Sequence, residues 1–383
     1  MDKIKFAFRK NHIYVVFLFF SYFLRRILLI IINKLFPLSN SLIYWYLMCL
    51  GEFLGGLTIF WYQSAFLRKR VKGSNSKNPI QLIETEREMN SIDNKCKVLF
   101  LLFLASYFDL IEVFITSDFI PSIVPLPSTS ELRLCFSMTI SSSLLCIFAL
   151  KKKIEKHQYY SLIILGISSL VIIIFEFIYR PKEKDLGSYM LSYLLLVLHF
   201  IFRSYTDVIE NYLGEYNFIS AFKIIMLEGI SNSIMLVIYS IFWNPMIKIK
   251  DLYLELNTGD QVLFIILLFL YFLLCASVNV YKTYCNILYS PMAKSLGSYF
   301  CNSAFIIYHF ASGNDFISEG QRKYFYFFIN LILSVFIDIL GLIYNEFFVL
   351  NFWDLSNETH LIISDRAETQ EMLSIKDEDD DDE

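Results

Sequence analysis

The stretch VLFIILLFLYFLLCASVNVY at Val262–Tyr281 contains no charged side chain. A helix that crosses the hydrocarbon core of a bilayer needs about 20 apolar residues, so this stretch is long enough to span it. Similar runs occur along the whole chain, at Ile13–Asn33, Ser41–Phe66, Val98–Ser117, Leu132–Leu150, Tyr159–Tyr179, Ser188–Ile209, Ile219–Phe242, Met292–Phe310 and Phe325–Leu350. We therefore predict an all-α polytopic membrane protein with ten transmembrane helices.

The overall composition favours the same class of protein. Of the 383 residues, 56% are hydrophobic and only 18% are charged, whereas soluble domains contain about 25% charged residues. The net charge of -4 comes largely from the closing run DEDDDDE, which has no basic stripe or aromatic platform beside it. Nucleic-acid binding is therefore excluded.

No sequence pattern indicates catalysis, a cofactor or a metal. The chain has no HExxH, GxSxG or phosphate-binding-loop motif, and its five histidines are dispersed. Its seven cysteines form no CxxC pair, and all but Cys96 lie in apolar runs, where they fit as small core residues. We expect neither an enzyme nor a bound cofactor or metal.

The distribution of Lys and Arg predicts the orientation in the membrane. The connections between runs are alternately rich and poor in these residues, and the richer side faces the cytosol. This side holds residues 1–12, the mixed-charge linker 68–97, the turn Lys151–Lys153 and the acidic tail 351–383. The linker and the tail are expected to be disordered, because neither can bury enough apolar surface to fold alone. Both termini are predicted to be cytosolic.

The connection Arg180–Gly187 divides the ten runs into two sets of five, residues 13–179 and 188–350. An odd number of crossings in each half makes the two halves enter the membrane from opposite faces. Two inverted five-helix repeats are typical of secondary transporters, which bind their solutes between the repeats.

Charged side chains inside the predicted spans need a partner or water, since each costs about 2.5–3.5 kcal/mol at the bilayer centre. Those singled out are Arg25, Arg26, Glu52, Asp109, Glu112, Glu176, Arg203, Asp207, Lys223, Glu228, Lys294 and Asp338. Arg203 and Asp207 have i,i+4 spacing and are expected to pair on one helix face. Glu228 is expected to pair with a base from another helix. Asp109 and Glu112 share a face, where two carboxylates repel and one could hold a proton.

Several short motifs occur in the order found in one transporter family. They are GEFLGG at Gly51–Gly56, FDL at Phe108–Leu110, LR at Leu132–Arg133, ENYLGEYN at Glu210–Asn217, LEG at Leu227–Gly229 and GLIYNEFFVL at Gly341–Leu350. Up to Leu350 the chain resembles the drug/metabolite transporter superfamily, specifically the nucleotide-sugar-transporter-like solute carriers of eukaryotes. The resemblance implies ten helices in two inverted repeats around a central cavity, with both termini cytosolic. Within the first motif, Gly51 and Gly55 form a GxxxG pattern that favours close helix packing.

The resemblance also implies phosphate-binding cations on the fourth and ninth helices, at positions that match Arg133 and Lys294. Arginine offers a planar fork to phosphate and lysine a compact point charge. Each residue has a structural alternative, Arg133 as an interfacial anchor beside Glu131 and Lys294 as a side chain that snorkels to the cytosol. Ser298 and Cys301 lie where members of the family tend to carry a further acid and arginine.

Together these features predict a secondary transporter that moves a small anionic organic solute, a nucleotide sugar or related metabolite, by alternating access. The predicted location is a Golgi, endoplasmic reticulum or endolysosomal membrane. Partners would be the small-molecule substrate and membrane lipids, and the architecture is compatible with a homodimer. Substrate-binding residues would be Arg133, Lys294, Asp109 and Glu112, and structural or coupling charges Glu52, Arg203, Asp207 and Glu228.

The sequence is also compatible with two other functions. A non-transporting membrane scaffold or receptor could retain the transporter fold without its cavity chemistry, and Ser298 and Cys301 favour that alternative. A membrane-embedded enzyme would need a nucleophile or a metal cluster, and the sequence shows neither pattern.

The predicted orientation can be tested at Asn357, which begins the sequence NET in the acidic tail. An oligosaccharide is attached to such a sequon only on the lumenal side. We expect Asn357 to carry no glycan, as measured by glycosidase treatment and mass spectrometry of the native protein. A glycan on Asn357 would contradict the cytosolic assignment of the tail.

Overall fold

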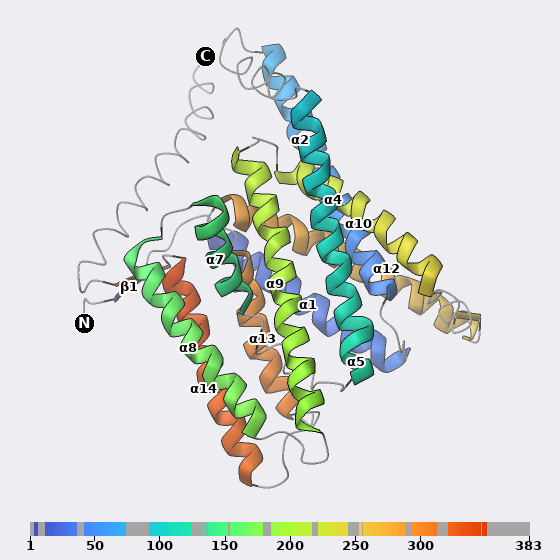
Figure 1. The fold of residues 1–383 in the computed structure, drawn as a ribbon. Coiled ribbons are helices and arrows are strands. Elements are labelled where there is room, and N and C mark those ends of the chain that lie inside the picture. Colours follow the sequence, from blue (N-terminus) through green and yellow to red (C-terminus); the bar gives the residue numbers. More distant parts are fainter. Residues whose placement is uncertain are drawn as a thin grey trace.

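In the computed structural model the chain forms a bundle of long helices (Figure 1). The structure describes residues 4–6, 12–36, 42–73, 92–123, 134, 137–151, 154–178, 185–216, 221–243, 253–254, 256–288, 293–311, 321–345 and 347–350. Each predicted apolar run contains a helix. Those of the first half are α1 (His12–Leu35), α2 (Leu42–Gly73), α4 (Ile92–Phe114), α7 (Ser137–Leu150) and α8 (Lys156–Ile178). Those of the second half are α9 (Leu186–Tyr216), α10 (Ala221–Trp243), α12 (Thr258–Leu288), α13 (Ala293–Ala311) and α14 (Gln321–Tyr344).

The helices have the length and the outer surface of membrane spans. Within the described part of the chain, seven helices are long and apolar enough to cross a bilayer, namely α1, α2, α8, α9, α10, α12 and α14. Large apolar side chains point outward from several helices, and Trp61, Phe148, Ile241 and Phe242 are 72–77% exposed. So much outward-facing apolar surface suits lipid and not water. The chain is a polytopic helical membrane protein.

Three predicted boundaries are wrong. Parts of the linker predicted at 68–97 are helical, because α2 continues to Gly73 and α4 begins at Ile92, while residues 74–91 lie outside the described residues. Lys occurs in both extensions and Arg in that of α2, and both residues are good helix formers, which favours helices that continue beyond their apolar runs. The last run also divides, since α14 ends at Tyr344 and Phe348–Leu350 is a strand, β2. The third run leads into a π-helical turn, η1 (Ile115–Phe119), and then into α5 (Ile120–Ile123).

A small antiparallel sheet joins the segment before the first helix to the segment after the last one. Strand β1 (Ile4–Phe6) precedes α1, and it pairs with β2, which follows α14, in a register that places Ile4 opposite Leu350. The start of α1 and the end of α14 therefore lie on the same side of the bundle. The predicted N-terminal segment 1–12 contains β1, and the predicted tail 351–383 lies outside the described residues.

Glycines bring α2 very close to α12. A Cβ atom added at Gly51 would lie 2.8 Å from the Cβ of Cys275, and one at Gly55 would lie 2.9 Å from the carbonyl oxygen of Ala276. Only residues without a side chain allow such an approach. The packing role predicted for the GxxxG pattern is confirmed.

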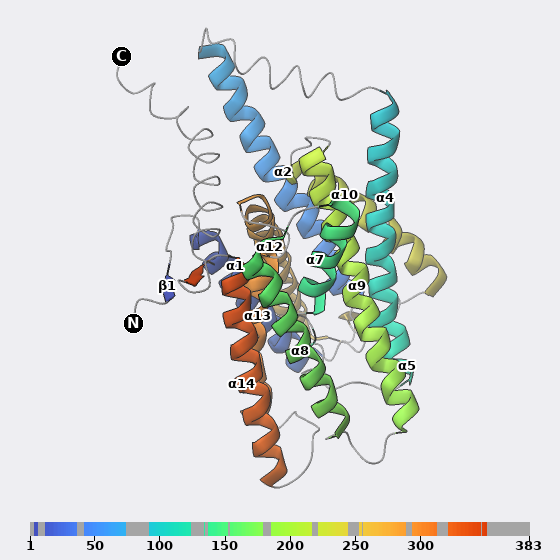
Figure 2. The same ribbon diagram turned by 60° about the vertical axis from the view of Figure 1, so that its left-hand side comes forward.

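The contact between α2 and α10 is reciprocal. A Cβ atom at Gly56 would lie 2.6 Å from the backbone nitrogen of Met226, and one at Gly229 would lie 2.4 Å from the backbone nitrogen of Phe53. Met226 precedes Gly229 by the same number of residues as Phe53 precedes Gly56. The two helices therefore cross with equivalent surfaces in contact, as in a two-fold symmetric pair. On another edge of the bundle, α8 and α14 run side by side (Figures 1 and 2).

The α2–α10 crossing can be tested by adding a side chain at Gly229. We expect Gly229→Val to reduce the yield of folded, monodisperse protein, because a backbone atom occupies the required space and overpacking costs about 1–3 kcal/mol or more. Gly166→Val in α8 is the matched control, since a Cβ atom there meets nothing within 4 Å. Size-exclusion chromatography and thermal unfolding in detergent measure both variants. Equal losses for the two variants would contradict the tight crossing.

Candidate functional site

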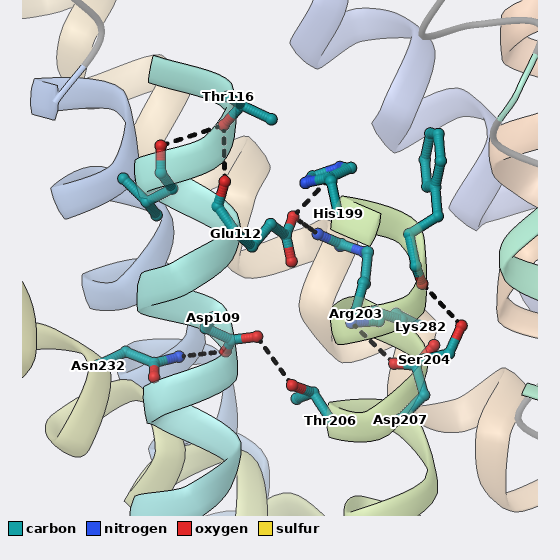
Figure 3. Close-up of polar contacts among 12 residues, drawn as sticks. Asp109, Glu112, Thr116, His199, Arg203, Ser204, Thr206, Asp207, Asn232 and Lys282 are labelled. Carbon is teal, nitrogen blue, oxygen red and sulfur yellow. Dashed lines mark hydrogen bonds and ion pairs between the residues drawn. The ribbon is translucent and has the colours of Figure 1, made fainter. Parts of the chain in front are cut away.

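Helices α4 and α9 lie side by side and present polar side chains to each other inside the bundle (Figure 3). Asp109 and Glu112 follow each other by three residues on α4, and Arg203 and Thr206 do so on α9. This spacing places each pair on one helix face. The two faces meet, so the polar side chains of α4 lie against those of α9.

Glu112 and Arg203 form a short ion pair between the two helices. The Nη1 atom of Arg203 donates to Oε1 of Glu112 at 2.7 Å, and the Glu112 side chain is 2% exposed. His199, one turn before Arg203, places its Nε2 atom 3.7 Å from the same oxygen. A buried carboxylate is stable only when its charge is balanced and hydrogen-bonded. Glu112 therefore depends on α9 for that balance.

Asp109 is held by different groups. Its Oδ1 accepts a hydrogen bond from the Thr206 hydroxyl at 3.0 Å, and its Oδ2 accepts one from Nδ2 of Asn232 in α10 at 2.9 Å. The same Nδ2 atom donates to Oε2 of Glu52 in α2 at 3.2 Å. One amide group thus connects two carboxylates that come from different helices.

A second cation enters the region from α12. The Nζ atom of Lys282 lies 3.8 Å from Oδ1 of Asp207, and the Asp207 side chain is 1% exposed. Sequence spacing had predicted a pair between Arg203 and Asp207 within α9. Instead, the structure places Arg203 against Glu112 of α4 and Asp207 against Lys282 of α12 (Figure 3).

A large cavity with a volume of about 510 Å³ opens beside this cluster. Its charged walls are unbalanced, because four cationic side chains face it and Glu112 is the single acid among its described lining residues. The cations are Arg25, Arg26, Arg203 and Lys282. Rings of Tyr22, Tyr44, Trp45, Tyr271, Tyr299 and Phe305 form much of the remaining wall. We name this space the basic cavity.

A smaller cavity of about 40 Å³ adjoins the basic cavity and has the opposite character. Six carboxylate side chains line it, Glu52, Asp109, Glu112, Asp207, Glu210 and Glu228, against the two cations Arg203 and Lys282. We name it the acidic cavity. Glu112, Arg203 and Lys282 line both cavities, so their ion pairs form the wall between the basic cavity and the acidic cavity.

The predicted substrate-binding residues are only partly placed by the structure. Arg133 lies outside the described residues, and Lys294 is in α13 but its side chain also lies outside the described part. Asp109 and Glu112 line the acidic cavity, and Glu112 also lines the basic one. The cation pair therefore stays a prediction.

The predicted structural charges gather at the same place. Glu52, Arg203, Asp207 and Glu228 come from α2, α9 and α10, and all line the acidic cavity. Glu228 is buried close to the charges of the other helices, and the base expected to pair with it stays a prediction. Charges that are scattered along the sequence are thus one cluster in space.

Sequence reasoning missed three parts of the site. Arg25 and Arg26 were noted as charges within a span, but their side of the helix was not determined. Lys282 was missed because the predicted span ended at Tyr281, whereas α12 continues to Leu288. Asn232 was missed because only charged side chains were considered within the predicted spans. A polar amide inside an apolar run could also have indicated a contact between helices.

Comparisons with known proteins add no assignment, because neither a protein-family model nor a curated protein matches this chain. Among the described residues, no group of three or more His, Cys, Asp or Glu side chains has the geometry of a metal site. The chemistry of the two cavities is therefore the basis for any functional conclusion.

The Arg203–Glu112 pair predicts strong coupling between two substitutions. Glu112→Leu leaves the Arg203 guanidinium without its acceptor, and breaking a buried pair costs about 3–5 kcal/mol. The double variant Glu112→Leu/Arg203→Met removes both charges, so we expect it to be more stable than either single variant. Thermal unfolding of the detergent-solubilised proteins measures the three variants. Additive losses would show that the two side chains are not coupled.

Proposed function

We propose that this protein is a secondary carrier that moves a small anionic organic solute across a membrane by alternating access. The observation that carries the proposal is the basic cavity, in which four cations face one carboxylate. A cavity of this size and charge inside a membrane protein suits a desolvated anion, because cations replace the hydration that the solute loses. A nucleotide sugar or related phosphorylated metabolite fits this description.

The small terminal sheet supports an even number of crossings. Because β1 pairs with β2, the chain enters α1 and leaves α14 on the same side. Seven crossings would place these ends on opposite sides of the membrane. We propose that α4, α7 and α13 cross as well. The polar side chains of α4 and α13 line internal cavities, where they are tolerated, and α7 is a shorter apolar helix. This brings the number of crossings to ten.

The packing of the helices supports two inverted repeats. The proposed repeats match α1, α2, α4, α7 and α8 with α9, α10, α12, α13 and α14 in that order. Under this matching, the contacts α1–α12, α2–α12, α1–α13 and α13–α14 become α4–α9, α4–α10, α7–α9 and α7–α8, all of which occur. The contacts α2–α10 and α8–α14 are unchanged when the two repeats are exchanged. The reciprocal glycines of α2 and α10 would then lie on the pseudo-two-fold axis that relates the repeats.

The cations of the basic cavity come from both proposed repeats. Arg25 lies on α1 and Arg203 on its counterpart α9, so the two guanidinium groups approach the cavity from the two halves. Arg25 also lies over the ring of Tyr22, 5.1 Å from its centroid. A forked donor beside an aromatic face suits a solute with a phosphate or carboxylate group and a planar part. Relative motion of the two halves would expose the basic cavity alternately to the two sides of the membrane.

The location proposed for this carrier is an endomembrane, with both termini in the cytosol. The excess of Lys and Arg on one side of the predicted topology supports that orientation, and the terminal sheet supports a common side for both ends.

Counterflow in proteoliposomes tests the proposed function. The purified protein is reconstituted and screened with nucleotides, nucleotide sugars and organic carboxylates for exchange of an internal against an external solute. We expect at least one anion to exchange. Exchange of none of them by protein that is folded and correctly inserted would favour the scaffold or receptor alternative.

Substitution of Arg25 tests the basic cavity in the same assay. Hydrogen bonds to charged groups contribute about 1.5–3 kcal/mol, so we expect Arg25→Ala to weaken apparent affinity by roughly tenfold to a hundredfold. Lys34→Ala is the matched control, because Lys34 lies on the same helix but is exposed and does not line the cavity. Equal affinities for Arg25→Ala and Lys34→Ala would contradict the anion site. Arg133→Ala and Lys294→Ala test the predicted cation pair alongside.

A further inference from the structure

The carboxylates Glu52 and Asp109 share one hydrogen-bond donor group in the acidic cavity. Asn232 has two N–H hydrogens on Nδ2, and it donates to Oε2 of Glu52 at 3.2 Å and to Oδ2 of Asp109 at 2.9 Å. The three side chains come from α2, α4 and α10 (Asp109 and Asn232 are drawn in Figure 3). The amide satisfies one oxygen of each carboxylate but supplies no charge.

Within the described part of the chain, no cation lies at ion-pair distance from Glu52 or Asp109. The charged and titratable groups that face them come from every helix packed around the cavity, and they are Cys49 of α2, Glu112 of α4, Arg203, Asp207 and Glu210 of α9, Glu228 of α10 and Lys282 of α12. The two cations of this set lie against Glu112 and Asp207. Two ionised carboxylates joined by a neutral amide would repel strongly in this setting, so one of them has to carry a proton.

A second observation points to an occupant of this cavity that donates hydrogen bonds. The Ser106 hydroxyl is 1% exposed and the amide oxygen of Asn232 belongs to a side chain that is 5% exposed, yet neither atom has a hydrogen-bond partner in the described structure. Both residues line the acidic cavity together with Glu52 and Asp109. Buried polar atoms of this kind bind water or an ion. Here they would accept hydrogen bonds from a water molecule that delivers a proton.

The hydrogen bonds distinguish the two carboxylates. Asp109 accepts from both Thr206 and Asn232, whereas Glu52 accepts from Asn232. Each additional donor favours the ionised form of a carboxylate. Asp109 is therefore the better anion, and Glu52 is the better proton acceptor of the two.

We propose that Glu52 binds an exchangeable proton and that this proton is transported together with the anion in the basic cavity. The proton is taken from water on one side of the membrane, neutralises Glu52, and is released to water on the other side. Because the Glu112–Arg203 pair and Lys282 line both cavities, neutralising Glu52 makes the potential at Arg203 and Lys282 more positive. Protonation thus favours anion binding, and loss of the proton favours anion release. This inference rests on the proposed carrier function and names its coupling ion.

Infrared difference spectroscopy of the purified full-length protein tests the proton site without any solute. Spectra recorded in acidic and alkaline buffer should show the C=O stretch of a protonated carboxyl group that changes with pH and shifts in deuterated water. Glu52→Gln should remove this band. Asp338→Asn is the matched control, because Asp338 is also buried but accepts a hydrogen bond from Ser303 outside both cavities. A pH-dependent C=O signal that is the same in the unmodified protein and in Glu52→Gln, or the absence of any such band, would overturn the assignment of the proton to Glu52.

Uptake driven by a pH gradient tests the coupling, with the panel anion that gives the strongest counterflow. An acidic exterior should make the unmodified protein and Asp338→Asn accumulate this anion, whereas Glu52→Gln should reach only passive equilibration while its counterflow is retained. Counterflow by the unmodified protein without gradient-driven accumulation would overturn the coupling and leave the carrier function intact. Accumulation that requires sodium at constant pH would also overturn it. A Glu52 band in a protein without counterflow would support the proton site and reject the carrier.

Discussion

The ion pair between Arg203 and Glu112 is the interaction on which the interior of this bundle depends. It joins α9 to α4 at 2.7 Å, and Glu112 is almost completely buried. In a membrane interior neither charge is stable alone, so the pair fixes how the two helices face each other. It also lies in the wall of both cavities. The separation of the basic cavity from the acidic cavity follows from the position of this pair.

The bundle combines very close helix contacts at α2 with an open cavity. The glycine contacts of α2 with α10 and α12 leave no room for a Cβ atom, so the backbones touch directly. The basic cavity, by contrast, leaves about 510 Å³ open between the helices. Under the proposed alternating access, a rigid crossing beside a hollow space would let two halves rock about a fixed contact while the cavity changes its opening. In that proposal, the reciprocal geometry of Gly56 and Gly229 would place α2 and α10 at the centre of the motion.

Apolar runs of about 20 residues predicted the position of every long helix, because the need to satisfy backbone hydrogen bonds in lipid leaves few alternatives. The ends of the helices were less predictable. Helix α2 continues past its predicted apolar run to Gly73, and α12 continues past the predicted end at Tyr281 to Leu288, so Lys282 was missed. The pairing of Phe348–Leu350 with Ile4–Phe6 depends on contacts between the two ends of the chain, which no local pattern reports.

The site shows a similar division. Spacing along one helix predicted that Arg203 pairs with Asp207, but spacing contains no information about a neighbouring helix that offers Glu112 at shorter range. Which charges meet depends on the rotation of each helix about its axis, and that rotation is determined by packing, including the glycine contacts. The intramembrane charges themselves were visible in the sequence, since each is costly in lipid and signals a partner or a cavity.

The proposed anion site is tested most directly by an experimental structure of the protein with the anion that exchanges in counterflow, determined by electron cryo-microscopy in a lipid nanodisc. We expect density for the anion in the basic cavity, in contact with Arg25, Arg203 or Lys282. Density for the anion at any other site, or a basic cavity that is filled by protein side chains or lipid, would contradict it.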